Sequence, residues 1–237
     1  MLFLKKESDK CMKLIIFPHA GGFASYYHEM AEKIDSEVIV FEYSGRGRRA
    51  SRESYSDFEE LICDAVEKLS EYFLKDGEDY CLFGHSMGAY AAIETAFRMQ
   101  YYYDYPPKCV FISGQSSPYY EKNQYTEKSD EELSQYLISL GGLRSESMEM
   151  YLKQLLPIIR QDMRLLDGYR YREKSLPYNG SLYLMYGEAD DEIRKEELCS
   201  WKGIAAGETY VRAYSGGHFY FKNELDDVCD YISRCVS

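Results

Sequence analysis

Gly84, Ser86 and Gly88 form the pattern Gly-x-Ser-x-Gly. The apolar run 79–83 before it predicts a buried strand, and the Ala-rich segment 89–97 after it predicts a helix. A serine on a sharp strand-to-helix turn is a nucleophile elbow, in which small neighbours let the chain pass close by and the hydroxyl stays exposed at the helix N-terminus. The same pattern occurs in ordinary turns, but the flanking elements favour Ser86 as a nucleophile.

A serine nucleophile needs a base, and the sequence contains four histidines. His218 lies in a loop directly after the last predicted strand, which places it on the same edge of the sheet as Ser86. His28 falls within a predicted helix and is expected to face solvent. His85 is next to the serine and is expected to pack behind it. We therefore predict His218 as the base.

The base needs a carboxylate to orient it, and two candidates follow the penultimate predicted strand. Asp190 and Asp191 both give the chain order serine, acid, histidine, which is the order of α/β-hydrolases. The spacing from Gly187 places Asp190 just beyond the turn and favours it. Asp191 is the alternative acid, or else the cap of a helix starting near Glu192.

The tetrahedral intermediate of such a reaction needs two backbone donors for its oxyanion. Met87 follows the nucleophile and is predicted to supply one N–H group. The second is assigned to Ala20, because 18–22 follows the first predicted strand and contains the small residues that let backbone approach a substrate.

The composition excludes several other classes of protein. The 237 residues carry a net charge of −12, which argues against general nucleic-acid binding. No apolar segment is long enough to span a membrane and no signal peptide is evident, so we expect a cytoplasmic protein. The 7 cysteines occur singly and predict reduced thiols. Neither His nor Cys has the spacing of metal ligands, so no metal site is predicted.

The elements that must position these residues alternate between strand and helix. Strands are predicted at 13–17, 37–43, 79–83, 109–113, 181–186 and 208–214, with helices at 23–34, from Ser56 or Asp57 to 73, at 89–101 and at 224–234. This alternation predicts a mainly parallel sheet with helices on both faces, within one domain spanning 1–237. We expect a monomer, because such a domain buries its own core.

The alternation is interrupted between 116 and 176, which reads as an inserted helical lid. Helical pieces are expected at 130–140, 147–156 and 158–171, broken at 141–142 and at Pro157.

Four arginines, Arg46, Arg48, Arg49 and Arg52, occur within seven positions of this acidic chain. They are equally compatible with a solvated loop and with a docking patch for an acidic partner or a phosphate.

The chain resembles the type II thioesterases of nonribosomal peptide and polyketide synthesis, members of the α/β-hydrolase superfamily. Matching segments run in order along nearly the whole chain, and those of the predicted lid are the most specific. They are 17–22, 45–49, 83–89, 113–118, 140–142, 155–162, 187–191 and 216–219. One departure is Ser44, where the family usually has proline, and it affects a loop rather than the chemistry.

The resemblance implies hydrolysis of acyl or aminoacyl thioesters from the phosphopantetheine arm of carrier proteins, with no cofactor held by the enzyme itself. It implies Ser86 as nucleophile, His218 as base and Asp190 as the orienting carboxylate, with Met87 and Ala20 as oxyanion donors. Carrier proteins are typically acidic, so the arginine cluster is a candidate docking site.

Two other functions compete with this interpretation. One is a general carboxylesterase or a fatty acyl-carrier thioesterase on the same scaffold, since a fold does not determine a substrate. The other is a catalytically silent protein that only binds a carrier, against which the complete set of Ser86, Asp190 and His218 argues. The preferred acyl chain depends on how the lid packs, and this packing cannot be derived from the hydrophobic periodicity of the sequence.

Overall fold

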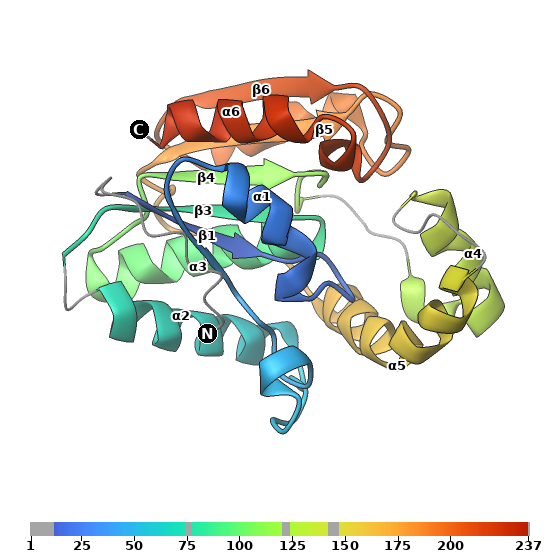
Figure 1. The fold of residues 1–237 in the computed structure, drawn as a ribbon. Coiled ribbons are helices and arrows are strands. Elements are labelled where there is room, and N and C mark those ends of the chain that lie inside the picture. The colour runs from blue at the N-terminus through green and yellow to red at the C-terminus, as the bar shows by residue number, and fades with distance from the viewer. Residues whose placement is uncertain (1–11, 74–76, 120–123, 142–146, 237) are drawn as a thin grey trace.

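A parallel six-stranded sheet forms the centre of the molecule, with strand order β2-β1-β3-β4-β5-β6 (Figure 1). The computed structural model describes residues 12–73, 77–119, 124–141 and 147–236. Every strand pair is parallel, so the predicted α/β class is confirmed. The strands are β1 Lys13–Phe17, β2 Glu37–Val40, β3 Tyr80–His85, β4 Cys109–Ser113, β5 Ser181–Gly187 and β6 Thr209–Tyr214.

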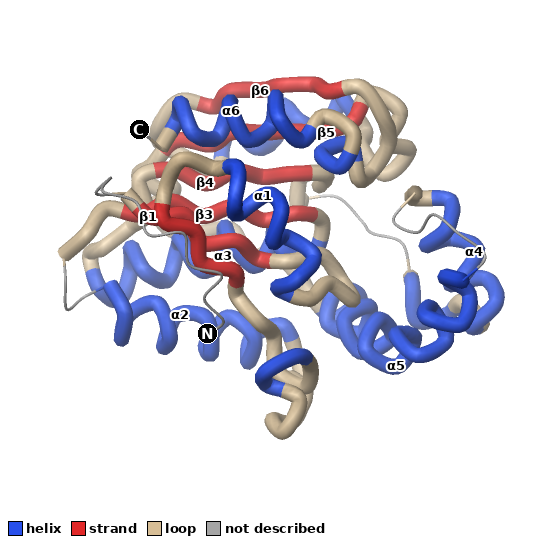
Figure 2. The backbone as a smooth tube through the Cα atoms, in the orientation of Figure 1, coloured by secondary structure: helices blue, strands red, loops and turns tan. Residues whose placement is uncertain are grey.

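Helices cover both faces of this sheet (Figure 2). Helices α1 (His28–Lys33) and α6 (Leu225–Cys235) pack on one face, against the side chains of Leu14 and Ile16. Helices α2 (Phe58–Phe73) and α3 (Met87–Tyr103) pack on the other, against Ile15 and Phe17. Alternate residues of β1 therefore enter two separate cores, which explains why the strand is a continuous apolar run.

A helical insertion lies between β4 and β5, beyond the carboxyl ends of the strands (Figure 1). It contains the 3₁₀ turn η3 (Tyr125–Glu127), α4 (Asp130–Ser139) and α5 (Ser147–Gly168). Ser129 and Glu132 form a capping box at the start of α4. Gly141 follows α4 with φ of 77°, while 142–146 lie outside the described residues.

The predicted break at Pro157 is wrong, because α5 continues through it. Proline removes one helical hydrogen bond. The neighbouring Leu156 and Ile159 are buried against the core, and this packing outweighs the missing bond. The prediction failed because it considered only the local effect of the proline and not the tertiary packing of the helix.

Smaller differences concern element ends and short helical turns. The predicted strand 37–43 ends at Val40, which pairs with Ile16 of β1, and the following Phe41 N–H still donates to the Ile16 carbonyl at 2.8 Å. Segment 23–34 begins as the 3₁₀ turn η1 (Ala24–Tyr27) before α1. Asp57 is the cap of α2, as its Oδ1 accepts from the Glu60 N–H at 2.8 Å. The remaining 3₁₀ turns are η2 Gly47–Arg49, η4 Lys195–Gly203 and η5 Tyr220–Lys222.

In the described ranges, every helix is too short or too polar to traverse a lipid bilayer.

Candidate active site

Ser86 occupies a strained turn between β3 and α3. Its φ of 55° and ψ of −120° are unusual for a residue with a side chain. A Cβ atom on Gly84 would collide with the Gly88 backbone, and one on Gly88 with the carbonyl of Phe17. The Ser86 N–H donates to the Ser113 carbonyl of β4 at 2.8 Å. The turn therefore has the conformation expected of a nucleophile elbow.

His218 is paired with Asp190 on the neighbouring loops. The distance from His218 Nδ1 to Asp190 Oδ2 is 2.8 Å, and both side chains are buried. Asp190 Oδ1 also accepts from the Glu192 N–H at 3.1 Å, which fixes the carboxylate plane. Asp191 is exposed. The structure therefore joins Asp190, and not Asp191, to the predicted base.

The alternative prediction that Asp191 caps a helix near Glu192 is wrong. The next helical turn, η4, begins at Lys195, and no side chain caps it. The Glu192 N–H is instead bonded by Asp190, so the loop is organised around the same carboxylate that holds His218.

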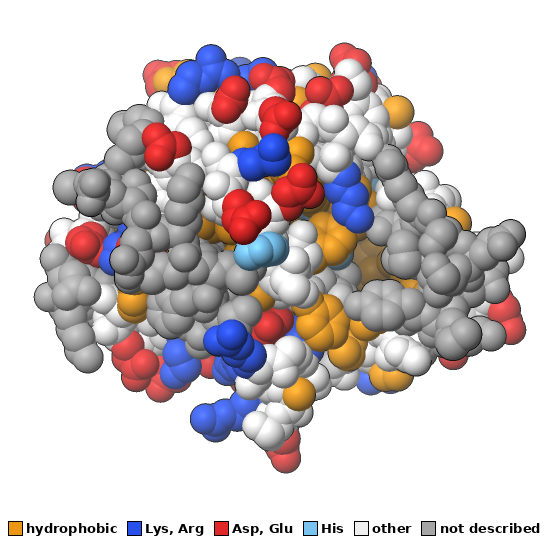
Figure 3. All heavy atoms as spheres, viewed as in Figure 1, with side chains coloured by type: hydrophobic (Ala, Val, Ile, Leu, Met, Phe, Trp, Pro, Cys, Tyr) orange, Lys and Arg blue, Asp and Glu red, His pale blue; other side chains and the backbone are white. Residues whose placement is uncertain are grey.

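Ser86 and His218 share one cavity of about 550 Å³ with the oxyanion loop, which we define as residues 18–22. Much of the cavity wall is apolar and comes from the helical insertion. In the space-filling view, hydrophobic side chains show in a hollow at the right of the face, where the insertion approaches the sheet (Figure 3). The apolar wall from α4 and α5 comprises Tyr136, Leu137, Leu152, Leu155, Ile159, Met163 and Leu166, with Leu140 directly after α4.

The oxyanion loop leaves one backbone donor available. The N–H groups of His19, Gly21 and Gly22 donate to Tyr27 Oη, an Asp162 oxygen and the His19 carbonyl, at 3.2, 2.6 and 2.9 Å. Across the parts of the chain that the structure describes, the Ala20 N–H has no such partner. The Met87 N–H opens α3, and the first N–H groups of a helix lack intrahelical acceptors. Both N–H groups are therefore available for the role that the sequence predicts.

Two further histidines lie at the site and are held neutral: His85 packs against His218, and His19 packs against His85. Burial lowers the pKa of His19 to about 3 and that of His85 well below its usual value, and the positive charge of His218 adds to both effects. His85 Nδ1 lies 3.0 Å from Ser113 Oγ, which in turn contacts Tyr220 Oη at 2.7 Å. The His85 ring centre is 4.8 Å from that of His218. His85 therefore supports the site from behind, as the sequence suggests, whereas His19 was missed.

The predicted arginine patch is wrong for two of its members. Arg46 is buried and makes a two-pronged ion pair with Asp162 of α5, at 2.7 and 2.5 Å. Arg49 makes a similar pair with Asp64 of α2, at 2.6 and 2.9 Å. Arg46 is buried and Arg49 is partly buried, and both guanidinium groups are occupied by carboxylates of neighbouring helices. Sequence clustering cannot show which arginines are buried.

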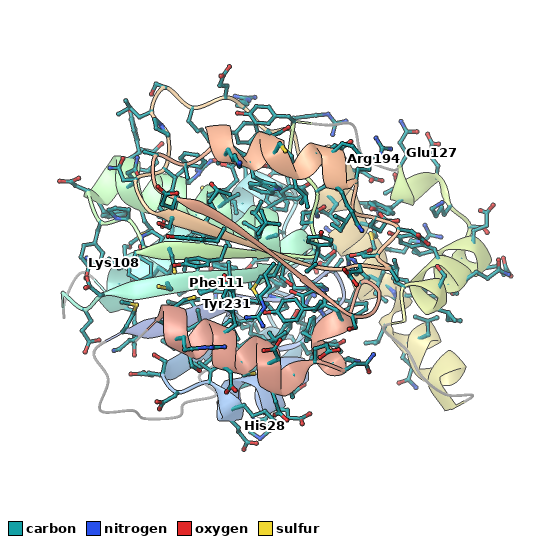
Figure 4. The ribbon with its side chains drawn as sticks, turned by 90° about the horizontal axis from the view of Figure 1, so that it is seen from above. His28, Lys108, Phe111, Glu127, Arg194 and Tyr231 are labelled. Atoms are coloured by element: carbon teal, nitrogen blue, oxygen red, sulfur yellow. The ribbon has the colours of Figure 1, made fainter. Side chains whose placement is uncertain are left out.

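Arg48 and Arg52 are exposed, and docking stays a prediction for these two. The cavity is also lined by Asp191, which the sequence offered as the alternative acid, and by charged residues that the sequence analysis missed, namely Glu192, Arg194, Glu197 and Lys222. Figure 4 shows Arg194 and Glu127 on the side that carries the insertion, at the opposite end of the sheet from Lys108. Among the described residues, no cluster of His, Cys, Asp or Glu side chains could hold a metal ion.

Comparison with known proteins agrees with this geometry. Residues 12–235 match the family described as Thioesterase domain. The chain belongs to this thioesterase family. Hydrolase chemistry, predicted from the elbow and its partners, is thereby confirmed at the level of the enzyme class.

Relatives of this thioesterase include thioesterases of biosynthetic pathways. It is 28% identical to Thioesterase PikA5 of Streptomyces venezuelae over 232 residues, covering 95% of this chain and 81% of that one. The RedJ thioesterase of the Streptomyces coelicolor prodiginine pathway has a TM-score of 0.87 and 27% identity, covering 99% and 90%. The type II thioesterase BorB of the borrelidin cluster also has a TM-score of 0.87 and 27% identity, covering 100% and 97%. The predicted resemblance and the α/β-hydrolase fold are confirmed.

Proposed function

We propose that this thioesterase hydrolyses acyl or aminoacyl thioesters carried on the phosphopantetheine arm of a peptide- or polyketide-synthase carrier protein. The observation that carries the proposal is the Asp190–His218 pair, whose histidine lines the same cavity as the strained Ser86. The likeness to BorB, a type II thioesterase of a biosynthetic cluster, supports the substrate class. In this role the enzyme removes stalled or misprimed units from the carrier.

Each residue has a defined task in the proposed reaction. Asp190 accepts a hydrogen bond from Nδ1–H of His218 and so leaves Nε2 free to take the proton of the Ser86 hydroxyl as it attacks the thioester carbonyl. The oxyanion that forms is stabilised by the N–H groups of Ala20 and Met87. The thiol then leaves with a proton from His218, and water activated by the same histidine releases the acid from the acyl-enzyme.

The segment 116–176 is proposed to act as a lid over this site within the single domain 1–237. Its apolar side chains form the cavity wall opposite Ser86, which suits an acyl chain. The matched residue range 12–235 runs through the insertion without interruption, which supports one domain.

A fatty acyl-carrier thioesterase or a carboxylesterase is the second candidate. The apolar wall favours it, as does 25% identity to the medium-chain S-acyl fatty acid synthase thioesterase of Anas platyrhynchos, over 98% of this chain and 94% of that one. A carrier-binding protein without activity is disfavoured, because the Asp190–His218 hydrogen bond is intact.

The test is hydrolysis of acetyl, aminoacyl and longer acyl groups from a phosphopantetheinylated carrier protein, with free acyl-coenzyme A and a nitrophenyl ester in parallel. We expect turnover of the carrier-bound substrate to exceed that of the free thioester. Ser86→Ala should reduce kcat by about 10⁴-fold or more. Faster ester cleavage with little carrier activity would favour the esterase, and equal turnover by Ser86→Ala would refute the mechanism.

A further inference from the structure

A buried ion pair joins α5 to the loop after β2. Asp162 of α5 is 1% exposed and Arg46 is 3% exposed. Arg46 donates through both terminal nitrogens to the two Asp162 oxygens, at 2.7 and 2.5 Å. Burial by itself lowers the pKa of Arg46, but the Asp162 carboxylate raises it above its ordinary value, so the guanidinium stays charged.

The same pair holds the oxyanion loop from both sides. Asp162 Oδ2 accepts from the Gly21 N–H at 2.6 Å, and Arg46 donates to the Gly22 carbonyl at 3.1 Å. Gly21 has φ of 77°, and a Cβ atom there would lie 2.5 Å from Cγ1 of Ile159, also on α5. Residues of α5 and the loop after β2 thus determine the position of the peptide group that follows Ala20.

We infer that Asp162, held by Arg46, is a positioning residue that orients the Ala20 N–H toward the oxyanion and couples this donor to the acyl-binding helix α5. The inference rests on the proposed thioester hydrolysis. An oxyanion donor is effective only within a few tenths of an ångström of its productive position, and a misplacement of about 1 Å costs about 100-fold in rate. An unsupported glycine-rich loop would not maintain that accuracy.

The coupling follows from which residues share the helix. Leu155, Ile159 and Met163 of α5 line the cavity, and Asp162 lies one residue before the last of them. A shift of α5 caused by an acyl chain therefore moves the carboxylate that anchors Gly21. Arg46 also neutralises Asp162, whose negative charge would otherwise disfavour an oxyanion nearby.

The experiment compares Asp162→Asn, Asp162→Ala and Arg46→Lys with Asp64→Asn. Asp64 is the matched control, because it makes the same kind of two-pronged pair with Arg49 and lies outside the cavity. For each variant, kcat and KM are measured on an acyl-pantetheine thioester. Binding is measured for an acyl trifluoromethyl ketone, which forms a tetrahedral adduct with Ser86, and for the matching thioether, which does not. Thermal melting shows that each variant is folded.

We expect Asp162→Asn to lower kcat by about 10- to 100-fold, with KM within about threefold of wild type. The affinity for the ketone should fall by the same factor as kcat, while the affinity for the thioether should be unchanged. Arg46→Lys should lower kcat less than Asp162→Ala does. Asp64→Asn should keep kcat within about twofold of wild type. If Asp162→Ala does not fold, Asp162→Asn and Arg46→Lys decide the question.

The inference is overturned if Asp162→Asn keeps kcat within twofold of wild type. It is also overturned if ketone and thioether binding weaken equally, which would indicate general damage to the cavity. Ser86→Ala distinguishes failure of the inference from failure of the proposed function. Loss of activity in Ser86→Ala with full activity in Asp162→Asn would refute only the inference, and turnover by Ser86→Ala would refute the proposed function.

Discussion

At the scale of single residues, the surroundings of a side chain decide its role more than its type. Asp190 and Asp191 are adjacent, but only Asp190 is buried and bonded to His218. A buried carboxylate that accepts a hydrogen bond from a histidine N–H fixes the ring tautomer and stabilises the imidazolium that forms during the reaction. An exposed neighbour does neither.

Replacing the two aspartates one at a time tests this difference. Asp190→Asn should lower kcat by about 10⁴-fold, because the amide no longer selects the tautomer with a free Nε2. Asp191→Asn should retain turnover within about tenfold. Steady-state kinetics on one thioester measures both variants, and a greater loss in Asp191→Asn would contradict the assignment.

Burial of neutral His19 predicts acid sensitivity of the fold. Its pKa is about 3 in the folded protein, against 6.5 when exposed, so between these values the unfolded chain binds more protons. The free energy of unfolding therefore falls as the pH falls through this window, by about 2 kcal/mol from pH 7.5 to 5 for this group. Denaturant unfolding at both pH values measures the loss.

The His19 contribution is isolated by comparing His19→Gln with His28→Gln. His28 is exposed, so His28→Gln should lose as much stability on acidification as wild type. His19→Gln should lose about 2 kcal/mol less. An unchanged loss in His19→Gln would show that other groups cause the acid sensitivity.

At the scale of elements, the elbow depends on the close approach of β1, β3 and α3. A Cβ atom on Gly88 would overlap the Phe17 carbonyl, so α3 could not pack at its present distance. Overlap with backbone is not relieved by side-chain rotation.

Gly88→Ala is therefore expected to lower the free energy of unfolding by about 3 kcal/mol or more. Gly203→Ala in η4 is the control, since no atom lies within 4 Å of its added Cβ, and it should change stability by less than about 0.5 kcal/mol. Denaturant unfolding compares the two. Similar stabilities would mean that the elbow tolerates a wider separation.

At the scale of the whole molecule, the cavity lies between the carboxyl edge of the sheet and the insertion. The sheet edge contributes Ser86 and His218, while α5 contributes apolar side chains such as Leu155. In the proposed function, the nucleophile and the base come from the sheet edge, and the wall for the acyl chain comes from the insertion. A monomer with this division of roles stays a prediction.

Leu155→Trp should shorten the cavity. Each methylene of the acyl chain that is excluded from an apolar site costs about 0.8 kcal/mol of binding free energy. Excluding two methylenes therefore lowers kcat/KM for long acyl chains by about 10-fold or more. Acetyl turnover should remain within about threefold. Leu176→Trp, at a position that is 67% exposed and outside the cavity, is the control. A loss for every chain length would argue against a separate acyl wall.

The sequence by itself determined the order of the strands along the chain, the elbow and the pairing of a late histidine with a nearby aspartate. These features depend on local patterns, namely apolar runs, glycine positions and loops that follow parallel strands. The tertiary structure decided the rest. It joined His218 to Asp190, which the spacing only favoured, carried α5 through Pro157, and placed Arg46 and Arg49, candidate docking residues, in internal ion pairs. Burial caused each of these outcomes, and burial depends on which distant segments pack together.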